Sequence, residues 1–381
     1  MQPNSPKELC ESLAGAAASG KSITLGGHFS KKGMAGPSKA SDVTVSTAKL
    51  SKVLQYEPAD LTLSVEAGAP WAEVCRVLSE HHQMIPLDPP FADTATVGGV
   101  IATNSSGPRR RLYGTARDLV IGMRFATLDG KEVQSGGMVV KNVAGLDMGK
   151  LMIGSFGTLA AISVVNFKLT PKPELEKTVL LDFDSPEAAF AARDKLIRSV
   201  LQPSAIDLLN PVATAQLGER GYILAVQFGG NAAVVERYAR EVGGAIREGA
   251  KQKEFWDSVI QYSQRFLQKF SDGTVVRISS TLTQLPEVMA AIRATQHAPA
   301  IARAATGVTY AYFNRTDAAV KWLSTVKAQP WRCLMEFSPE TKKQGLDLWP
   351  APGDDFGMMK KVKQMFDPRN LLNHGRLYRL I

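Results

Sequence analysis

The spacing of apolar residues predicts a mixture of helices and strands up to about residue 170. Leu9, Leu13 and Ala16 recur at helical spacing. Strict alternation of apolar and polar residues, as in DVTVS and LTLSVE, is typical of a strand with one buried face. On these two criteria we expect helices at residues 6–19 and 71–82, a helical turn at 50–54, and strands at 22–25, 42–46, 61–66, 119–128 and 159–169.

The pattern changes at the segment PKPELEK, residues 171–177, where a β-α-β-β-α order begins and then recurs. An antiparallel sheet covered by helices is the natural product of this order, which predicts an α+β fold. The expected elements are the strand 178–183, the helix 186–199, the strands 206–208 and 222–228, the helix 232–241, the strand 275–279, the helix 285–295, the strand 308–313, and the helices 316–327 and 357–365.

The composition indicates an ordinary globular protein that is long enough for two domains. Apolar residues make up 44% of the 381 residues and charged residues 21%. The cysteines Cys10, Cys75 and Cys333 stand alone, and no CxxC pair offers ligands for an iron–sulfur cluster or a structural zinc ion. We therefore expect no metal site, no disulfide framework and a reducing, cytoplasmic environment.

No segment predicts insertion into a membrane. The N-terminal residues are polar and carry charges of both signs, unlike the apolar core of a signal peptide. The longest apolar stretch, residues 151–165, is interrupted by glycine, serine and threonine. It is shorter than the roughly 20 residues that span a bilayer. We expect a protein without a membrane span of its own.

The formal net charge of +9 raises the question of an anionic partner. The one dense basic cluster, Arg109 to Arg111, follows a glycine-rich loop and has no row of aromatic residues on which bases could stack. We interpret the cluster as a solvated loop or a subunit contact, and we expect no nucleic-acid binding.

One nucleotide-binding motif occurs in the wrong structural context. The segment GAAASGKS, residues 15–22, satisfies the P-loop pattern. A P-loop needs a strand before its glycines and a helix after its lysine. Here a helix is expected before Gly15 and a strand after Lys21, so a glycine-capped helix explains the match better than an ATP site. No GxGxxG follows a predicted strand, which also argues against a Rossmann site.

Two glycine-rich loops point instead to a large anionic cofactor held mostly by main chain. The first is TLGGHFSKKG, residues 24–33, where a predicted strand runs into a loop. The second is TATVGGVIATNSSG, residues 94–107, which combines small size with hydrogen-bonding capacity. Glycines let a backbone approach a ligand closely, and successive N–H groups can cradle an anion.

The second loop and its surroundings resemble a known flavoprotein family. In order, the motifs DPP, ATVGGVIATNSSG, YG, RDLV, LDG, KNVAGLD and IGSFGTLAAIS between residues 85 and 171 are similar to the FAD-binding domain of the vanillyl-alcohol oxidase/PCMH family, in its lactate and glycolate dehydrogenase branch. The phrases YEPADLTLSVEAGAP, AVQFGGNAAVVERYARE and LDLWPAPGDDF resemble the FAD-binding subunits of bacterial glycolate oxidases.

The resemblance implies a domain organisation and a cofactor. A PCMH-type FAD-binding domain is expected over residues 1–173, with subdomains of about 1–55 and 56–173. An antiparallel, ferredoxin-like cap domain is expected over 174–335, followed by a C-terminal segment, 336–381, that returns to the flavin site. The FAD is expected to be non-covalent. His28 stands where this branch often has a third glycine, and a covalent bond between this histidine and the flavin is the alternative.

The same resemblance implies which residues contact FAD. The pyrophosphate is expected against Gly26, Gly27 and His28 on one side and Thr96, Gly98 and Gly99 on the other. The path toward the isoalloxazine ring is expected to be lined by Pro89, Asn104, Ser105 and Gly107. The adenosine and ribityl side is expected to involve Asn142, Gly145, Gly154, Ser155, Gly157 and Ile162. The ring itself is expected to be approached from the substrate side by Asn373, Gly375 and Arg376.

The catalytic residues are less apparent than the cofactor contacts. The histidine-rich HxGDGNxH segment of the hydroxy-acid dehydrogenases is absent. Oxidation of a 2-hydroxy acid needs a base for the hydroxyl proton and a cation for the carboxylate. His374 is the one histidine placed to act as the base, and Arg376 is the candidate cation.

The resemblance implies an FAD-dependent oxidoreductase acting on CH–OH groups. The expected protein is a subunit of a glycolate, or 2-hydroxy acid, dehydrogenase complex that oxidises glycolate to glyoxylate. Its expected partners are a paralogous flavin subunit and an iron–sulfur subunit, through which it would lie peripherally at the inner membrane. A stand-alone FAD-dependent oxidase or dehydrogenase of another hydroxy acid or alcohol, and a mainly structural subunit with a non-catalytic flavin, remain as alternatives.

Overall fold

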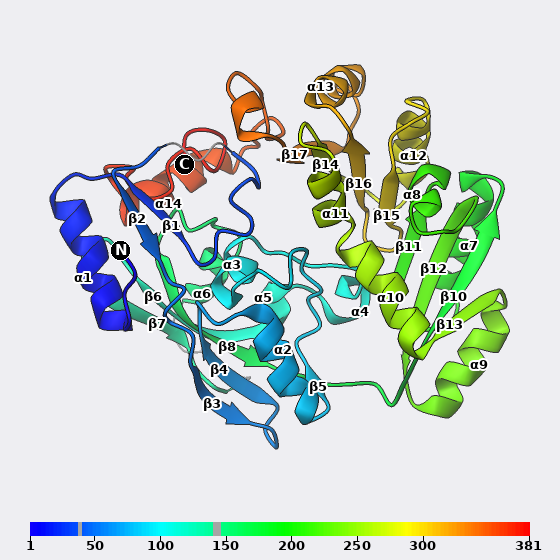
Figure 1. Cartoon of the computed structure of the whole chain (residues 1–381), viewed down its shortest axis with the longest axis horizontal. Coiled ribbons are helices and arrows are strands. Elements are labelled where there is room, and N and C mark those ends of the chain that lie inside the picture. The colour runs from blue at the N-terminus through cyan, green and yellow to red at the C-terminus, as the bar shows by residue number, and fades with distance from the viewer. Residues whose placement is uncertain (37–39, 140–145) are drawn as a thin grey trace. The chain divides into compact units, whose positions relative to one another are not determined.

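The chain folds into two compact units. The computed structural model describes residues 1–36, 40–139 and 146–381. Unit 1 comprises Met1–Ser106, Gly114–Pro171 and Ala351–Ile381, and unit 2 comprises Gly107–Tyr113 and Lys172–Pro350. Unit 1 is therefore built from segments at both ends of the chain, drawn in blue to green and in red in Figure 1. Residues 336–350, which the sequence analysis places in the C-terminal segment, belong to unit 2.

The larger sheet of unit 1 has five antiparallel strands around one apolar core. Its strand order is β3 (Val53–Glu57), β4 (Thr62–Glu66), β8 (Ala161–Lys168), β6 (Val120–Ala126) and β7 (Glu132–Gly136). The helices α2 (Trp71–Glu80) and α3 (Val97–Ala102) supply Trp71, Leu78 and Ile101 to this core. Short elements complete this part of the unit: β5 (Gln83–Met84), β9 (Thr170–Pro171), α5 (Ala116–Leu119) and α6 (Gly149–Met152).

A second, smaller layer of unit 1 joins the two ends of the chain. The strands β1 (Ile23–Gly26) and β2 (Val43–Ser46) form a parallel pair beside helix α1 (Pro6–Ala18) (Figure 1). Leu13, Ile23 and Val45 pack together with Leu372, which follows the C-terminal helix α14 (Phe356–Phe366). The C-terminal tail is thus part of the core of unit 1.

Unit 2 contains one eight-stranded antiparallel sheet. The strands lie in the order β13 (Ala245–Glu248), β10 (Leu175–Phe183), β12 (Tyr222–Gly230), β11 (Ala205–Leu209), β15 (Ala300–Arg303), β16 (Val308–Phe313), β14 (Thr274–Ser279) and β17 (Arg332–Phe337). The β-α-β-β-α halves join where β11 pairs with β15. In that register Asp207 lies opposite Arg303, and the two form a buried ion pair.

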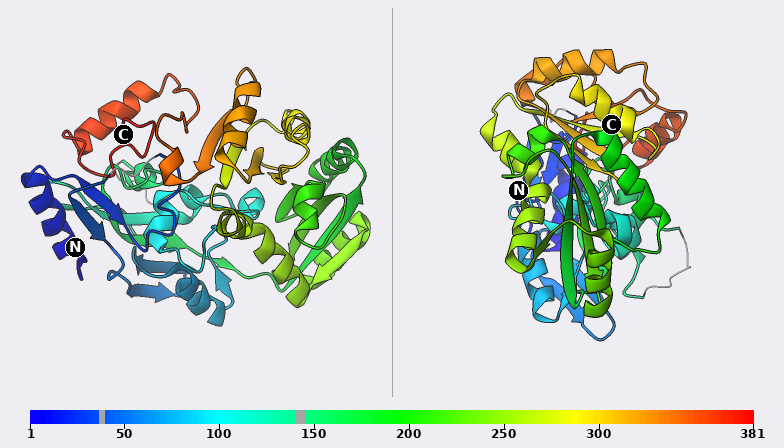
Figure 2. Two further views of the ribbon diagram at one scale, coloured as in Figure 1. Left: turned by 45° about the horizontal axis from the view of Figure 1, so that its top comes forward. Right: turned by 90° about the vertical axis from the view of Figure 1, so that its right-hand side faces the viewer.

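Helices cover both faces of the sheet of unit 2, as Figure 2 shows around its green strands. One face packs against α7 (Pro186–Arg198), α9 (Ala232–Val242), α12 (Leu285–Arg293) and α13 (Thr316–Thr325). The other meets α10 (Gly249–Ile260) and α11 (Tyr262–Lys269), where the Trp256 indole donates to Thr178 Oγ1 at 2.7 Å. Thr178 precedes the core residue Val179, and successive strand residues face opposite ways. The remaining short helices are α4 (Arg110–Tyr113), α8 (Pro211–Ala215) and a 3-10 turn at Glu340–Lys342.

The predicted α+β fold is confirmed, but one of the elements predicted from the sequence is wrong. Residues 50–54 do not form a helical turn, because β3 starts at Val53 and pairs with β4 across the turn at Pro58–Leu61. The pairing of the two strands overrides the weak helical spacing. The sequence analysis also misses α10 and α11. In the described part of the chain, no helix combines the length and apolar character needed to cross a membrane.

Candidate cofactor site

A cavity in unit 1 lies where strand β1 ends, helix α3 begins and the C-terminal tail passes. It encloses about 1060 Å³ of empty space, including its open mouth. Its lining comes mainly from residues 22–32, 96–103, 156–162 and 371–376. A concave site lined by both apolar and polar residues is typical of a small-molecule or cofactor site.

Two glycines at the cavity leave no room for a side chain. A Cβ atom on Gly27 would lie 2.2 Å from Thr96 Oγ1, and one on Gly98 would lie 2.8 Å from the Cβ of Ala67. Thr96 is itself held in place, because its Oγ1 accepts a hydrogen bond from Gly99 N at 3.3 Å. Gly27 is therefore required by its contact with Thr96, and Gly98 by its contact with Ala67, which follows β4.

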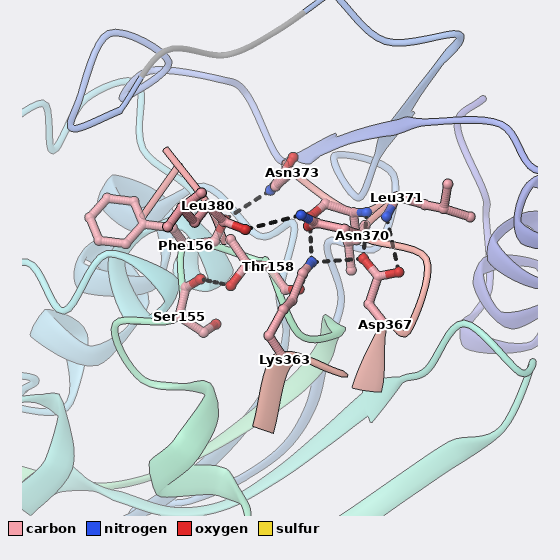
Figure 3. Close-up of polar contacts among 10 residues, drawn as sticks. Ser155, Phe156, Thr158, Lys363, Asp367, Asn370, Leu371, Asn373 and Leu380 are labelled. Carbon is pink, nitrogen blue, oxygen red and sulfur yellow. Dashed lines mark hydrogen bonds and ion pairs between the residues drawn. The ribbon is translucent and has the colours of Figure 1, made fainter. Parts of the chain in front are cut away.

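The loop at residues 154–157 docks onto the end of helix α3. Gly154 N donates to Ile101 O at 3.1 Å, and Phe156 N donates to Ala102 O at 2.8 Å. Gly154 adopts a positive φ of 77°, which glycine reaches without strain. The loop in turn receives the C-terminal tail, because Asn373 Nδ2 donates to Phe156 O at 2.8 Å. Figure 3 shows this contact.

Asn373 and Lys363 fix the path of the tail along the cavity (Figure 3). The Asn373 amide accepts from Leu25 N at 2.8 Å and donates to Leu25 O at 3.1 Å, so it pairs with the edge of strand β1. The Lys363 ammonium donates to Thr158 O at 2.8 Å, to Leu372 O at 3.1 Å and to Asp367 Oδ2 at 2.7 Å. Burial lowers the pKa of Lys363, while its contact with Asp367 opposes that effect.

The basic side chains of the cavity have no acidic counterpart in its lining. The lining includes His28, Lys31, Lys32, His374 and Arg376, and none of the described lining residues is an aspartate or glutamate. Lys31 is buried, and the loss of hydration lowers the pKa of its ammonium to about 8. Such a lining favours an anionic ligand.

Arg376 holds the loop after β1 against the tail. Its guanidinium donates to the carbonyl oxygens of Lys32 at 2.7 Å and Lys31 at 3.4 Å, and it lies 5.7 Å from the ring centroid of Phe156. Gly36 N donates to Arg376 O at 3.1 Å. Arg376 thus has a structural role. Its expected contact with a substrate carboxylate stays a prediction.

The structure gathers most, but not all, of the residues expected to contact FAD. The cavity is lined by Gly26, Gly27, His28, Thr96, Gly98, Gly99, Gly157, Ile162, Asn373, His374 and Arg376. Residues of unit 1 outside the lining are Pro89, Asn104, Ser105, Gly154, Ser155 and Gly375. Gly107 belongs to unit 2. Asn142 and Gly145 fall outside the residues that the structure describes.

The sequence analysis misses several residues of the cavity. The largest are Phe29, Lys31, Lys32 and Phe156. A pair of lysines after a glycine-rich turn is typical of a solvated loop, so the sequence gives no sign that one of them is buried. No group of three or more potential metal ligands occurs among the described residues.

The P-loop match, residues 15–22, reaches this cavity only with its last residue, Ser22. Helix α1 continues through Gly15 to Ala18, and strand β1 starts only at Ile23. Lys21 is exposed, and it is not part of the cavity lining. The order of helix before strand is the reverse of a P-loop.

We therefore expect no ATP binding that depends on Lys21. Titration of the full chain with Mg-ATP, followed by calorimetry, should give the same result for the wild type and for Lys21→Met. Tight ATP binding that the substitution abolishes would contradict the geometry.

Comparison with protein-family models supports the flavin assignment. Residues 1–136 match the FAD binding domain, and residues 351–377 match the C-terminal domain of FAD linked oxidases. The second match coincides with the segment that returns to unit 1. The fold and these matches define a flavoprotein whose cofactor is FAD.

Curated relatives of this chain include glycolate oxidase subunits and a D-lactate dehydrogenase. The chain is 36% identical over 137 residues to glycolate oxidase subunit GlcE of Escherichia coli, and 32% identical over 161 residues to subunit GlcD of Bacillus subtilis. It is 32% identical over 189 residues to mitochondrial D-lactate dehydrogenase [cytochrome] 1 of Saccharomyces cerevisiae. These matches cover 36%, 42% and 49% of this chain but only 39%, 34% and 31% of the relatives. The matched regions of the chain are thus similar to FAD-linked oxidases and to glycolate oxidase subunits.

Solved structures share the fold over almost the whole chain. A 4-ethylphenol oxidase from Gulosibacter chungangensis has a TM-score of 0.76 at 12% identity, with coverage of 99% of this chain and 88% of the oxidase. An alkyldihydroxyacetonephosphate synthase has a TM-score of 0.72 at 17% identity, with coverage of 98% and 76%. At such low identity the likeness concerns the fold alone.

Proposed function

We propose that this chain is the FAD-binding subunit of a glycolate, or 2-hydroxy acid, dehydrogenase complex. In this proposal glycolate is oxidised to glyoxylate, and the electrons pass to an iron–sulfur partner subunit. The observation that carries the proposal is the 36% identity of the FAD-binding region to a glycolate oxidase subunit. The lone cysteines support an iron–sulfur centre on another chain, because this chain lacks a cluster-binding motif.

The lining of the cavity in unit 1 suits FAD in charge. Its basic lining suits the diphosphate, and its glycines at 27 and 98 pack closely against Thr96 and Ala67, where a side chain would not fit. When bound, FAD supplies the capacity to accept a hydride from an alcohol carbon. In the proposal, the main chain at Gly26, Gly27 and His28 positions the diphosphate.

The substrate side of the proposal rests on His374. His374 lines the cavity, and it lies between Asn373 and Gly375 in the C-terminal tail. We propose that its imidazole takes the hydroxyl proton as a general base. Arg376, the proposed partner of the carboxylate, already donates to two backbone carbonyls, so a substrate would have to share this side chain with the loop.

Because the Arg376 side chain already donates to two backbone carbonyls, a second candidate function is also favoured. In that alternative, the flavin of this chain relays electrons and the paralogous subunit carries the substrate site. The two functions differ in what the purified chain does alone. A chain with its own site reduces its flavin with substrate, whereas a relay subunit requires its partner.

The visible spectrum of the purified, FAD-loaded chain, recorded anaerobically, tests the proposal. We expect glycolate to bleach the flavin band, while acetate, which lacks the hydroxyl group, leaves the band unchanged. We expect His374→Gln to slow the bleaching at least 100-fold while the FAD content stays the same, since general-base catalysis contributes about 10²–10⁴-fold. A band that stays oxidised with glycolate and with D-lactate would favour the relay function instead.

A further inference from the structure

Lys31 differs from every other buried lysine among the described residues. Lys177, Lys343 and Lys363 each lie within 3.0 Å of a carboxylate oxygen, from Glu236, Glu340 and Asp367 respectively. Lys31 is only 6% exposed, yet its Nζ has no hydrogen-bond partner in the described part of the chain. A buried ammonium without a partner is strongly unfavourable, so it is informative where it occurs.

The described lining of the cavity offers Lys31 no acidic side chain. The other titratable or charged groups of the cavity lining are His28, Lys32, His374 and Arg376, all of them basic. The Arg376 guanidinium donates to the backbone carbonyl oxygen of Lys31 at 3.4 Å, so this contact involves the main chain of Lys31 and not its ammonium. The counter-charge that Lys31 lacks must therefore come from a ligand.

We propose that the Lys31 ammonium binds the diphosphate of FAD. Lys31 lies four residues after Gly27, which meets Thr96 at the cavity. The diphosphate is the part of FAD that carries fixed negative charge, and a charge-assisted hydrogen bond to it would satisfy the buried ammonium. The inference rests on FAD occupying this cavity, and it holds whichever substrate the protein oxidises.

The loop around Lys31 is arranged to hold this side chain in place. Lys32 N donates to Phe29 O and Met34 N donates to Lys31 O, both at 3.0 Å, so two successive turns flank the lysine. Arg376 then fixes the same loop to the tail. Because the position is set before FAD arrives, the charge contributes to binding without a further ordering cost.

The proposal predicts opposite effects of one substitution on cofactor binding and on the apoprotein. In Lys31→Met, the affinities for FAD and for ADP should both fall about 10- to 100-fold, the range expected for a hydrogen bond to a charged group. Riboflavin, which lacks phosphate, should bind as to the wild type. The apoprotein should unfold at a higher temperature than the wild type, because the unpaired buried charge is gone.

Lys21→Met is the matched control for this experiment. It makes the same chemical change at an exposed position of unit 1 that is outside the cavity. We expect its FAD and ADP affinities to stay within twofold of the wild type. Equal affinities for Lys31→Met and Lys21→Met would overturn the proposal. Weaker binding of FAD and riboflavin but not ADP would also overturn it, since Lys31 would then face the flavin ring.

A measurement on the unmodified chain covers the case in which Lys31→Met does not fold. Burial lowers the pKa of Lys31 to about 8 in the free protein, so at pH 9 most of the side chain is neutral. Binding of the diphosphate should raise that pKa, and FAD binding at pH 9 should take up a proton. Calorimetry in two buffers of different ionisation enthalpy measures the uptake, and Lys31→Arg, which stays charged, should abolish it. Absence of uptake by the wild type would contradict the proposal.

A variant of the cavity itself distinguishes a wrong cavity assignment from a wrong role for Lys31. If Gly27→Val binds FAD like the wild type, FAD does not occupy this cavity, and the premise fails. If Gly27→Val loses FAD but Lys31→Met keeps wild-type affinity, the cavity assignment stands and the role of Lys31 is wrong.

Discussion

Gly27→Val is expected to abolish FAD binding, with at least a 100-fold loss of affinity. Even the first carbon of the new side chain would lie 2.2 Å from Thr96 Oγ1, well inside van der Waals contact. Thr96 cannot yield freely, because it caps helix α3 through Gly99 N. The two loops must separate, which displaces the backbone that the proposal places around the diphosphate. Titration of the apoprotein with FAD, followed by protein fluorescence, measures the effect.

Gly33→Val is the matched control, because it adds the same side chain in the same loop. A Cβ atom at Gly33 meets nothing within 4 Å, and Gly33 does not have a positive φ. We expect FAD affinity within threefold of the wild type for this variant. If both variants bind FAD equally well, the loop after β1 does not contact the cofactor. Circular dichroism of both variants separates loss of binding from loss of folding.

Lys363→Met is expected to destabilise the protein by about 3–5 kcal/mol, the usual effect of removing one partner of a buried ion pair. The Asp367 side chain is only 1% exposed, and it would be left buried without its counter-charge. The substitution also removes the hydrogen bonds from Lys363 to Thr158 O and Leu372 O, which connect α14 to the tail and to the loop at the cavity. Urea unfolding of the FAD-free chain measures the change in unfolding free energy.

Lys361→Met provides the comparison on the same helix. Lys361 is exposed, and its replacement should change the unfolding free energy by less than about 0.5 kcal/mol, as is usual for surface substitutions. The double variant Lys363→Met/Asp367→Leu should recover part of the lost stability, because no buried charge remains unpaired. Equal stability of the two single variants would contradict the role given to the Lys363–Asp367 pair.

The sequence predicts the elements of this fold wherever apolar spacing is regular. Helix α1 and strand β16 start where the pattern places them, because one face of each is buried in a core. The turn predicted at residues 50–54 fails because tertiary pairing decides the structure of β3, an edge strand whose residues Val53 and Leu54 are exposed. Helices α10 and α11 carry an overlooked signal, since Phe255, Val259 and Tyr262 recur at helical spacing.

The cavity was predictable in its glycines and not in its lysines. Gly27 and Gly98 are recognisable because a close backbone approach leaves a glycine in the sequence. Lys31 in the lining and Lys363 in α14 are not, because lysine is normally exposed and only the folded chain shows that these two are buried. Asn373 is an intermediate case: it was expected near the flavin ring, and its amide joins Leu25 to Phe156 at the cavity wall.

The central claim is that FAD lies in the cavity of unit 1 with its diphosphate against the loop after β1. A crystal structure of the full chain with FAD tests this most directly. We expect diphosphate density beside the main chain of Gly26, Gly27 and His28, with the Lys31 ammonium within hydrogen-bond distance of a phosphate oxygen. Density for FAD outside this cavity, or a diphosphate away from this loop, would contradict the account.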